Sequence, residues 1–258
     1  MIQNAPSDDD VFFLANILHE ISRPKDGLEL LYKFAEKKPS FNSSERSSFG
    51  IIFKASVDSI RKSLRILADH YADEEENNHS EYCDRIKEVQ AKSFDDLEKL
   101  CNETLDAIIN FLLPNAENIQ SEVFFLKLKG DIYRYISEFA TGEEREKSLL
   151  NAETAYSSAI PKATDHLIEA DPVRLGLLLN YAVFKYEHKR DCEDAKELLR
   201  NAIENVGNDF SDLTQEAVDE TKSIIEVMQS NLNNWSEYPD EDEDEDEEDH
   251  EHESNENE

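Results

Sequence analysis

Apolar residues recur at three- and four-residue steps along most of the chain, the spacing that places them on one face of an α-helix. Phe49, Ile52, Phe53 and Val57 show this spacing clearly, and it continues to Leu67. No stretch alternates apolar and polar residues for long enough to predict a β-strand. The pattern therefore predicts an all-α protein. Nine helices are expected, two of them within residues 8–40 and the others at residues 43–75, 80–113, 119–140, 143–167, 171–188, 192–206 and 211–235.

Several residues indicate where these helices begin and end. Pro24 suits the first turn of the second helix, because a backbone N–H is not needed there. Ser43 or Ser44 is expected to cap the third helix, and Pro114 to end the fourth. Pro161 falls inside the sixth helix and is expected to kink it. Because the linkers are short, consecutive helices should be antiparallel neighbours in a bundle.

The charge balance excludes whole classes of function. The 258 residues include 60 acidic and 27 basic side chains, and the formal net charge is -33. Such a chain repels nucleic acid and anionic membranes, so neither is expected as a partner. The three cysteines, Cys83, Cys101 and Cys192, are widely spaced, which argues against a disulfide framework and favours a reducing compartment. We therefore expect a cytoplasmic protein, with the nucleus as a second compartment.

The acidity is concentrated at the C-terminus. Residues 237–258 contain 15 acidic side chains and no lysine or arginine. Because a segment without aliphatic residues cannot form a core, we predict a disordered acidic tail after a helical domain that spans residues 1–236. The tail is interpreted either as a solubilising segment or as an internal anionic competitor for a basic site.

Two pairs of cations, each seven residues apart, carry the candidate chemistry. Lys54 and Arg61 share one helix face, as do Lys127 and Arg134, and Tyr135 follows Arg134 directly. A single pair of this kind is usually two solvated surface cations. Together, however, two arginines, a lysine and a tyrosine hydroxyl offer several charge-assisted hydrogen bonds to a dianion such as a phosphoryl group.

A second candidate face combines amides with apolar side chains. An asparagine amide both donates and accepts hydrogen bonds, as an extended peptide backbone requires. The alternative is that the apolar members belong to the core and the asparagines are exposed helix residues. The residues with helical spacing are Asn180, Val183 and Glu187 in one segment, and Ile224, Val227, Asn231 and Trp235 in another.

Four stretches of the chain resemble the 14-3-3 family. They are SERSSFGIIFK at residues 44–54, LLPNAENIQSEVFFLKLKGDIYRY at 112–135, DPVRLGLLLNYAVFKYE at 171–187 and SNLNNW at 230–235. The resemblance covers nearly all of the predicted helical domain. It implies a nine-helix antiparallel bundle that dimerises into a cup, in which each protomer has a groove for extended phosphoserine or phosphothreonine peptides.

The resemblance also implies roles for individual residues. The implied phosphate ligands are Lys54, Arg61, Arg134 and Tyr135. The implied contacts to the peptide backbone or side chains are Lys127, Asn180, Glu187, Asn231 and Trp235. The implied apolar groove wall is Gly176, Leu179, Val183, Ile224 and Val227, and Gly176 would allow close approach of the backbone. No metal ligand and no cofactor is implied.

A dimer interface is implied as well, with a second copy or a paralogue as the partner. Its residues would be Ile17, Ile21, Arg23, Asp26, Ser63, Leu67, Lys92 and Asp96. Arg23 and Asp26 would pair across the interface with Asp96 and Lys92. Ser63 stands where phosphorylation loosens dimers of the family, so a phosphate there is expected to do the same.

Three residues depart from the family pattern near the implied groove. Lys185 replaces an aromatic residue, and Ser223 and Asn234 replace apolar residues. These changes predict that selectivity beyond the phosphate differs from that of the family.

The functional hypotheses are therefore three. The first is a phosphopeptide-binding adaptor and scaffold in signalling, and the second is an acidic helical scaffold or chaperone that binds basic clients without phosphate dependence. The third, an enzyme, is disfavoured because the chain shows no metal-ligand spacing, nucleotide loop or nucleophile–base motif. His188 and Cys192 are four residues apart, but they flank an expected helix break and are interpreted as surface residues.

Overall fold

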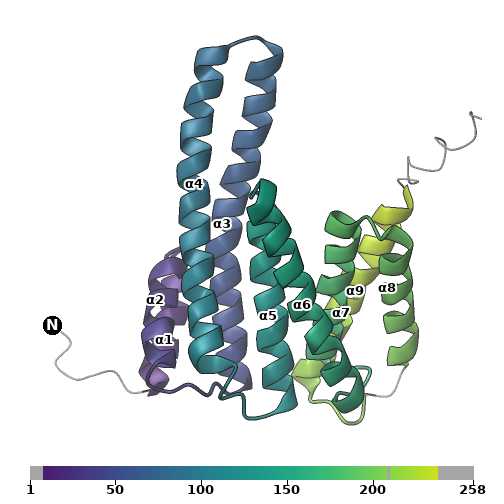
Figure 1. The fold of residues 1–258 in the computed structure, drawn as a ribbon. Helices are drawn as coiled ribbons and strands as arrows, with labels where there is room; N and C mark the ends of the chain where they lie inside the picture. Colours follow the sequence, from purple (N-terminus) through teal and green to yellow (C-terminus); the bar gives the residue numbers. More distant parts are fainter. Residues whose placement is uncertain (1–7, 208–209, 238–258) are drawn as a thin grey trace, which may run out of the picture.

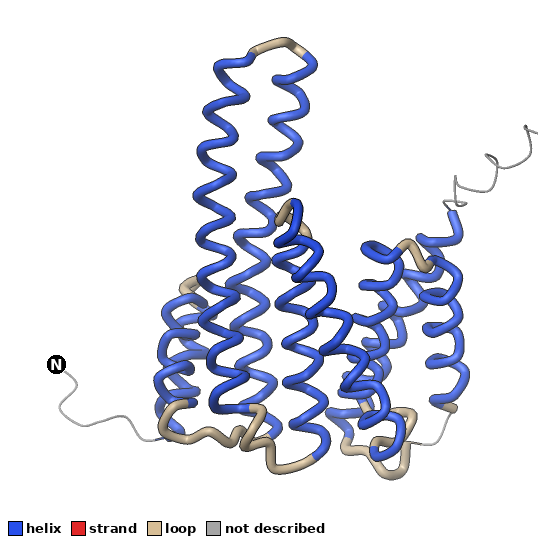
Figure 2. Tube along the Cα trace, in the orientation of Figure 1, coloured by secondary structure: helices blue, strands red, loops and turns tan. Residues whose placement is uncertain are grey.

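The computed structural model describes residues 8–207 and 210–237 as a bundle of helices (Figures 1 and 2). This part of the chain contains nine α-helices and no β-strand, as the apolar periodicity predicts. Two π-helical turns, η1 and η2, continue the ends of α4 and α7. The elements are α1 (Asp8–Glu20), α2 (Pro24–Ala35), α3 (Ser43–Glu76), α4 (Ser80–Ala107), η1 (Ile108–Leu112), α5 (Ile119–Ser137), α6 (Gly142–His166), α7 (Pro172–Phe184), η2 (Lys185–Lys189), α8 (Cys192–Val206) and α9 (Gln215–Glu237).

The helices pack as antiparallel neighbours along the chain (Figure 1). α3 and α4 form a long hairpin that extends well beyond the other helices, and α1 and α2 pack against its lower part. α5 and α6 form the next pair, followed by α7, α8 and α9. Because α5 contacts both α3 and α7, it joins the N-terminal and C-terminal parts of the bundle.

Three groups of buried apolar side chains hold these helices together. The first joins α1 to α5 and includes Phe53 and Tyr135, and the second lies around Tyr156 between α5, α6 and α7. The third joins α7, α8 and α9 around Met228. Gly130 permits the close contact between α5 and α6, because a Cβ atom there would lie only 2.6 Å from the ring of Tyr156. The candidate site lies where the first two groups meet.

The start of α3 differs from the prediction by one residue. Its N-cap is Asn42, not Ser43 or Ser44. The Asn42 side chain accepts a hydrogen bond from the backbone N–H of Glu45 at 3.0 Å, and the Glu45 carboxylate accepts one from the backbone N–H of Asn42 at 2.8 Å. This reciprocal capping box satisfies two N–H groups, whereas a serine cap alone would satisfy one.

The other helix boundaries follow the predictions closely. α2 begins at Pro24, as expected, whereas α9 begins at Gln215, four residues later than predicted. α6 runs through Pro161 as a single helix, and the kink at this residue stays a prediction. The helical segments predicted to end at residues 113 and 188 end in the π-helical turns η1 and η2.

The predictions for the C-terminal tail concern residues outside 8–207 and 210–237. The predicted acidic tail lies outside the described residues except for Glu237, the last residue of α9. The domain boundary and both tail hypotheses therefore stay predictions. Among the helices of residues 8–207 and 210–237, none combines the length and the apolar composition needed to cross a membrane.

Candidate functional site

Two arginine side chains from different helices converge on one tyrosine ring. The Cζ atom of Arg61, on α3, lies 4.1 Å from the centre of the Tyr135 ring, and that of Arg134, on α5, lies 4.8 Å from it. Tyr135 is buried and its ring stacks on Phe53. Burial raises the pKa of Tyr135 to about 12, so its hydroxyl keeps its proton at neutral pH. The fold thus brings the predicted Arg61, Arg134 and Tyr135 together.

Asp131 lies at the centre of the polar contacts around these arginines. Its side chain is almost completely buried. Its Oδ2 atom accepts a hydrogen bond from Lys127 Nζ at 2.8 Å, and its Oδ1 atom accepts one from the Tyr156 hydroxyl at 2.6 Å and one from Asn180 Nδ2 at 2.8 Å. Burial opposes ionisation, but Lys127 and Arg134 outweigh it and hold the pKa of the Asp131 carboxyl below its usual value. The ionised carboxylate therefore fixes the Lys127 ammonium group and, through Asn180, ties α7 to α5.

Protein carboxylates already occupy the donors of Arg61. Its Nε atom donates to Glu138 Oε2 at 2.7 Å, and its NH1 group donates to Asp58 Oδ1 at 3.0 Å. Glu138 also binds Arg65. These contacts hold the Arg61 guanidinium in place over the tyrosine ring.

Arg134 is held more loosely. It is 8% exposed, and its Nε atom donates to the Tyr156 hydroxyl at 3.5 Å. Its terminal nitrogens lie 3.9 Å from Asp131 Oδ1 and 3.9 Å from Glu187 Oε2, beyond hydrogen-bond distance. Within the described residues, this buried guanidinium therefore has N–H donors to spare.

The fourth predicted phosphate ligand stands apart from this group. Lys54 lies on α3, seven residues before Arg61, and its side chain is exposed. It makes no ion pair within residues 8–207 and 210–237. Its place in the site stays a prediction. We call Arg61, Lys127, Arg134 and Tyr135 the cationic cluster.

Two residues of the predicted amide-and-apolar face, one on α7 and one on η2, lie beside the cationic cluster. Asn180 bonds to Asp131, and Glu187 lies opposite Arg134. Gly176 lies one turn before Asn180, and a Cβ atom built on it would meet no atom within 4 Å. The surface beside Asn180 is therefore open at Gly176.

The remaining residues of this face divide between core and surface. Leu179 and Ile224 are half-buried and pack against the C-terminal core, which supports the core interpretation for these two. Val183 is half-buried, whereas Val227 on α9 is 46% exposed. Asn231 is half-buried, and the Trp235 ring stacks on Tyr186 at 4.2 Å. The roles of the α9 residues in peptide binding stay predictions.

The residues predicted for the dimer interface lie on or beside α1 to α4. Arg23 and Asp26, at the start of α2, form an ion pair with each other. Ser63 donates its hydroxyl hydrogen to the backbone carbonyl of Ser59 at 3.0 Å. Every residue of the predicted interface is exposed or half-buried, namely Ile17, Ile21, Arg23, Asp26, Ser63, Leu67, Lys92 and Asp96. All eight are thus accessible in the single chain, and the dimer stays a prediction.

The surface interpretation of His188 is wrong. Only 10% of its side chain is exposed, and its ring centre lies 5.9 Å from that of Phe184. The chain does break at Arg190, which has a φ of 55°. The π-helical turn η2 precedes this break, and its extra residue shifts His188 out of the α-helical register. Lys185, in the same turn, binds Asp191 and Asp194 at the start of α8.

Sequence reasoning missed three residues that position the cationic cluster. Asp131 had a local signal, because it lies four residues after Lys127 and three before Arg134, on the same helix face. Tyr156 and Glu138 had none, because they meet their partners only through the packing of α3, α5 and α6.

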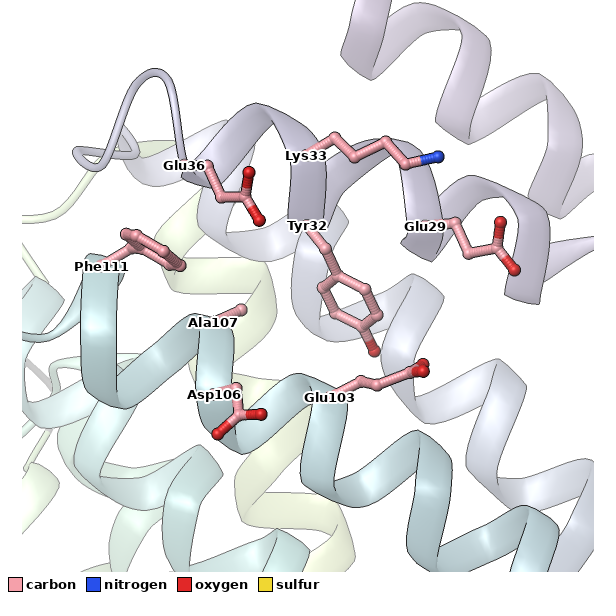
Figure 3. A pocket seen from close by; sticks show the side chains of 8 residues that line it. All are labelled: Glu29, Tyr32, Lys33, Glu36, Glu103, Asp106, Ala107 and Phe111. Carbon is pink, nitrogen blue, oxygen red and sulfur yellow. The ribbon is translucent and has the colours of Figure 1, made fainter.

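A separate cavity of about 380 Å³ lies between α2 and the end of α4 (Figure 3). Its lining includes four carboxylates and a single ammonium group, so it repels anions. None of the residues predicted to bind phosphate or peptide lines it. The lining residues are Glu29, Tyr32, Lys33, Glu36, Glu103, Asp106, Ala107 and Phe111. The cationic cluster is therefore the better candidate for phosphate.

The fold and the cationic cluster define an all-α protein with two arginines, the buried Arg134 and the half-buried Arg61, where the N-terminal and C-terminal parts of the bundle meet. A family model described as "14-3-3 protein" matches residues 14–236. The "14-3-3-like protein GF14 epsilon" of Arabidopsis thaliana is 32% identical over 224 residues, which are 87% of this chain and 88% of that protein. The "Checkpoint signal transducer rad24" of Schizosaccharomyces pombe is 30% identical over 230 residues, 89% of this chain and 85% of that protein.

The chain belongs to the 14-3-3 family. The resemblance in the four sequence stretches and the predicted all-α fold are both confirmed. Membership supports a phosphopeptide-binding adaptor or scaffold role in general terms.

Proposed function

We propose that this chain is an adaptor that binds phosphoserine or phosphothreonine peptides between α3, α5, α7 and α9, without catalysing a reaction. The observation that carries the proposal is the buried Arg134, whose terminal nitrogens lie 3.9 Å from the nearest carboxylates. A phosphate at pH 7 carries about −1.5 to −2 charges and three acceptor oxygens. It would complete the hydrogen bonds that Arg134 lacks, whereas an unmodified hydroxyl would not.

Asn180 is oriented to bind the backbone of the same peptide. Its Nδ2 atom donates to Asp131 at 2.8 Å, which fixes the amide. Within the described contacts its Oδ1 atom accepts no hydrogen bond, so this oxygen is available to a peptide N–H. Gly176 leaves room for the peptide on the same helix. Asn231 is proposed as the corresponding contact from α9, where the exposed Ser223 and Asn234 would make the adjoining surface polar.

The test compares a fluorescent phosphoserine peptide with its unphosphorylated twin by anisotropy at two salt concentrations. We expect binding of the phosphopeptide alone. Because a hydrogen bond to a charged group contributes about 1.5–3 kcal/mol, Arg134→Ala should weaken binding by about 10- to 100-fold. The matched control is Arg200→Ala, since Arg200 is exposed on α8. This variant should bind like the wild type.

Two outcomes would overturn the proposal. The first is equal binding of both peptides by the wild type, which would favour the acidic scaffold or chaperone that recognises basic clients. The second is phosphopeptide binding that Arg134→Ala leaves unchanged, which would place any phosphate site elsewhere.

We also propose that the adaptor is a dimer, with a second copy of this chain or a paralogue. Large exposed apolar side chains on or just after α1 and on the α3–α4 hairpin support this, because a partner chain that covered them would remove apolar surface from water. They are Phe13 at 64%, Ile21 at 57%, Ile66 at 45%, Tyr82 at 59% and Val89 at 51%. Two linked sites would raise the avidity for clients with two phosphosites.

Light scattering tests the dimer. The wild type should have the mass of two chains, and Ser63→Glu should shift it towards one, because a charge would enter the proposed interface. Ser47→Glu, at an exposed position near the start of the same helix, is the control and should stay dimeric. A monomeric wild type, or a fully dimeric Ser63→Glu variant, would contradict the respective part of this proposal.

A further inference from the structure

His188 lies next to the cationic cluster, although it contributes none of the predicted contacts. Its side chain is 10% exposed in the π-helical turn after α7 and packs on Phe184. Its Nε2 atom lies 3.8 Å from Glu187 Oε2, and the same oxygen lies 3.9 Å from Arg134 NH1. One carboxylate oxygen of Glu187 therefore lies near both the His188 imidazole and the Arg134 guanidinium.

Charged groups from α3, α5 and α6 act on this imidazole. Burial is the main cause that lowers the pKa of His188 to about 4, and the positive charges of Arg134, Arg145 and Arg61, from α5, α6 and α3, lower it further. Glu138, directly after α5, acts in the opposite direction. The imidazole is therefore neutral at pH 7 while the cationic cluster holds no ligand.

A phosphate in the cationic cluster would reverse this electrostatic balance. Its negative charge would offset the arginines that repel a proton on the imidazole. It would also compete with Glu187 for Arg134, and the released carboxylate would face His188 alone. Both changes favour the imidazolium form.

We propose that His188 is a proton-linked specificity residue of the phosphate site, whose imidazole takes up a proton when a phosphorylated peptide binds. The inference rests on the proposed function. By linkage, protonation of His188 contributes nothing to peptide affinity when the pH is well above the pKa that the imidazole has in the complex. This contribution to affinity grows as the pH falls through that pKa. Below the pKa of the free state the contribution is constant, because the imidazole is then charged in both states.

The first experiment measures phosphopeptide Kd for wild type, His188→Gln and a control, His166→Gln, across the pH range. His166 is exposed and is the last residue of α6. The ligand phosphate titrates near pH 6 for all three proteins, so the informative quantity is the ratio of variant to wild-type Kd. For His188→Gln this ratio should be near 1 at about pH 8 and rise to about threefold or more at about pH 5.5. For His166→Gln it should stay constant.

The second experiment needs no variant and so does not depend on how His188→Gln folds. NMR follows the ring resonances of His188 during pH titrations of the full chain. Saturation with the phosphopeptide should raise the titration midpoint by about two pH units, the shift that the threefold ratio at about pH 5.5 requires, and the unphosphorylated peptide should leave it unchanged.

The outcomes separate this inference from the function on which it rests. A His188→Gln ratio that does not change with pH, or a midpoint unmoved by bound phosphopeptide, overturns the inference while the proposed function stands. A wild-type protein that binds no phosphopeptide at about pH 7.5 overturns both.

Discussion

Replacing Asp131 by asparagine would remove one charge from the buried centre of the cationic cluster and keep the size of the side chain. In the wild type, Oδ2 binds Lys127, while Oδ1 accepts hydrogen bonds from Tyr156 and Asn180. An asparagine has one oxygen and one NH₂ group. Whichever way the amide turns, its NH₂ group faces a donor, and at least one of these donors loses its acceptor.

The expected loss of stability is about 3 kcal/mol at pH 7. A buried donor left without an acceptor costs about 1–3 kcal/mol, and breaking a buried ion pair costs about 3–5 kcal/mol. The side chain of Lys127 is 17% exposed and can turn to water, which places the expectation at the lower end of the second range. For a domain of this size, the Tm should fall by about 6–12 °C.

The loss should depend on pH in a defined direction. The folded-state pKa of Asp131 is lower than that of an unfolded aspartate, which is about 3.9. The carboxylate therefore stabilises the fold fully above the unfolded value, and this contribution disappears as the pH falls through the folded value. The difference between Asp131→Asn and wild type should be largest at neutral pH and shrink in acid.

Urea unfolding followed by circular dichroism measures this effect, at one fixed protein concentration because a dimer would make stability depend on concentration. The control is Asp165→Asn, which alters an exposed aspartate on α6 and should change stability by less than about 0.5 kcal/mol. A loss below about 1 kcal/mol for Asp131→Asn, or a loss that does not change with pH, would refute the proposed role of this carboxylate.

Three further predictions concern single positions. Gly130→Ala should destabilise the fold by about 1–3 kcal/mol in denaturant unfolding, because its Cβ would lie 2.6 Å from Tyr156. Gly176→Ala should instead stabilise the fold by about 0.5–1 kcal/mol, because the added Cβ atom meets no other atom and alanine favours the helix. Weaker phosphopeptide binding by this variant would support a peptide contact at the open surface beside Gly176. Burial and the neighbouring Glu144 raise the pKa of Glu98 to about 7, so wild-type stability should fall as the pH rises from about 4.5 to 7. Glu98→Gln should therefore be more stable than the wild type at about pH 8. Equal stability of the two proteins at that pH would contradict this prediction.

The helices of this protein were predictable because helix periodicity is a local property. Phe49, Ile52, Phe53 and Val57 are all buried, as their three- and four-residue spacing predicts. The choice of cap was not predictable, because Asn42, Ser43 and Ser44 are all good caps. Asn42 is the cap because it shares reciprocal hydrogen bonds with Glu45, whose carboxylate is also held by Lys38.

The candidate site was partly predictable for the same reason. Spacing alone places Lys127 and Arg134 on one face of α5, and the adjacent Tyr135 follows from the sequence. That Arg61 lies over the Tyr135 ring depends on how α3 packs against α5, and no local pattern contains this information. The family resemblance supplied the pairing. The structure places Arg61 over the Tyr135 ring and Lys54 apart from it, and the role of both residues in phosphate binding stays a prediction.

By itself, then, the sequence determines the all-α fold, the faces of the individual helices and the family, because each depends on spacing or on matched stretches of chain. Only the tertiary structure decides which charges are neutralised and which remain available. Asp131 is buried against Tyr156, and Arg134 is left with donors to spare. His188 lies beside them with its side chain mostly covered. These outcomes depend on burial and on atoms brought together by packing, and the physical reason is that desolvation and Coulomb interactions act through space, between residues far apart in the chain.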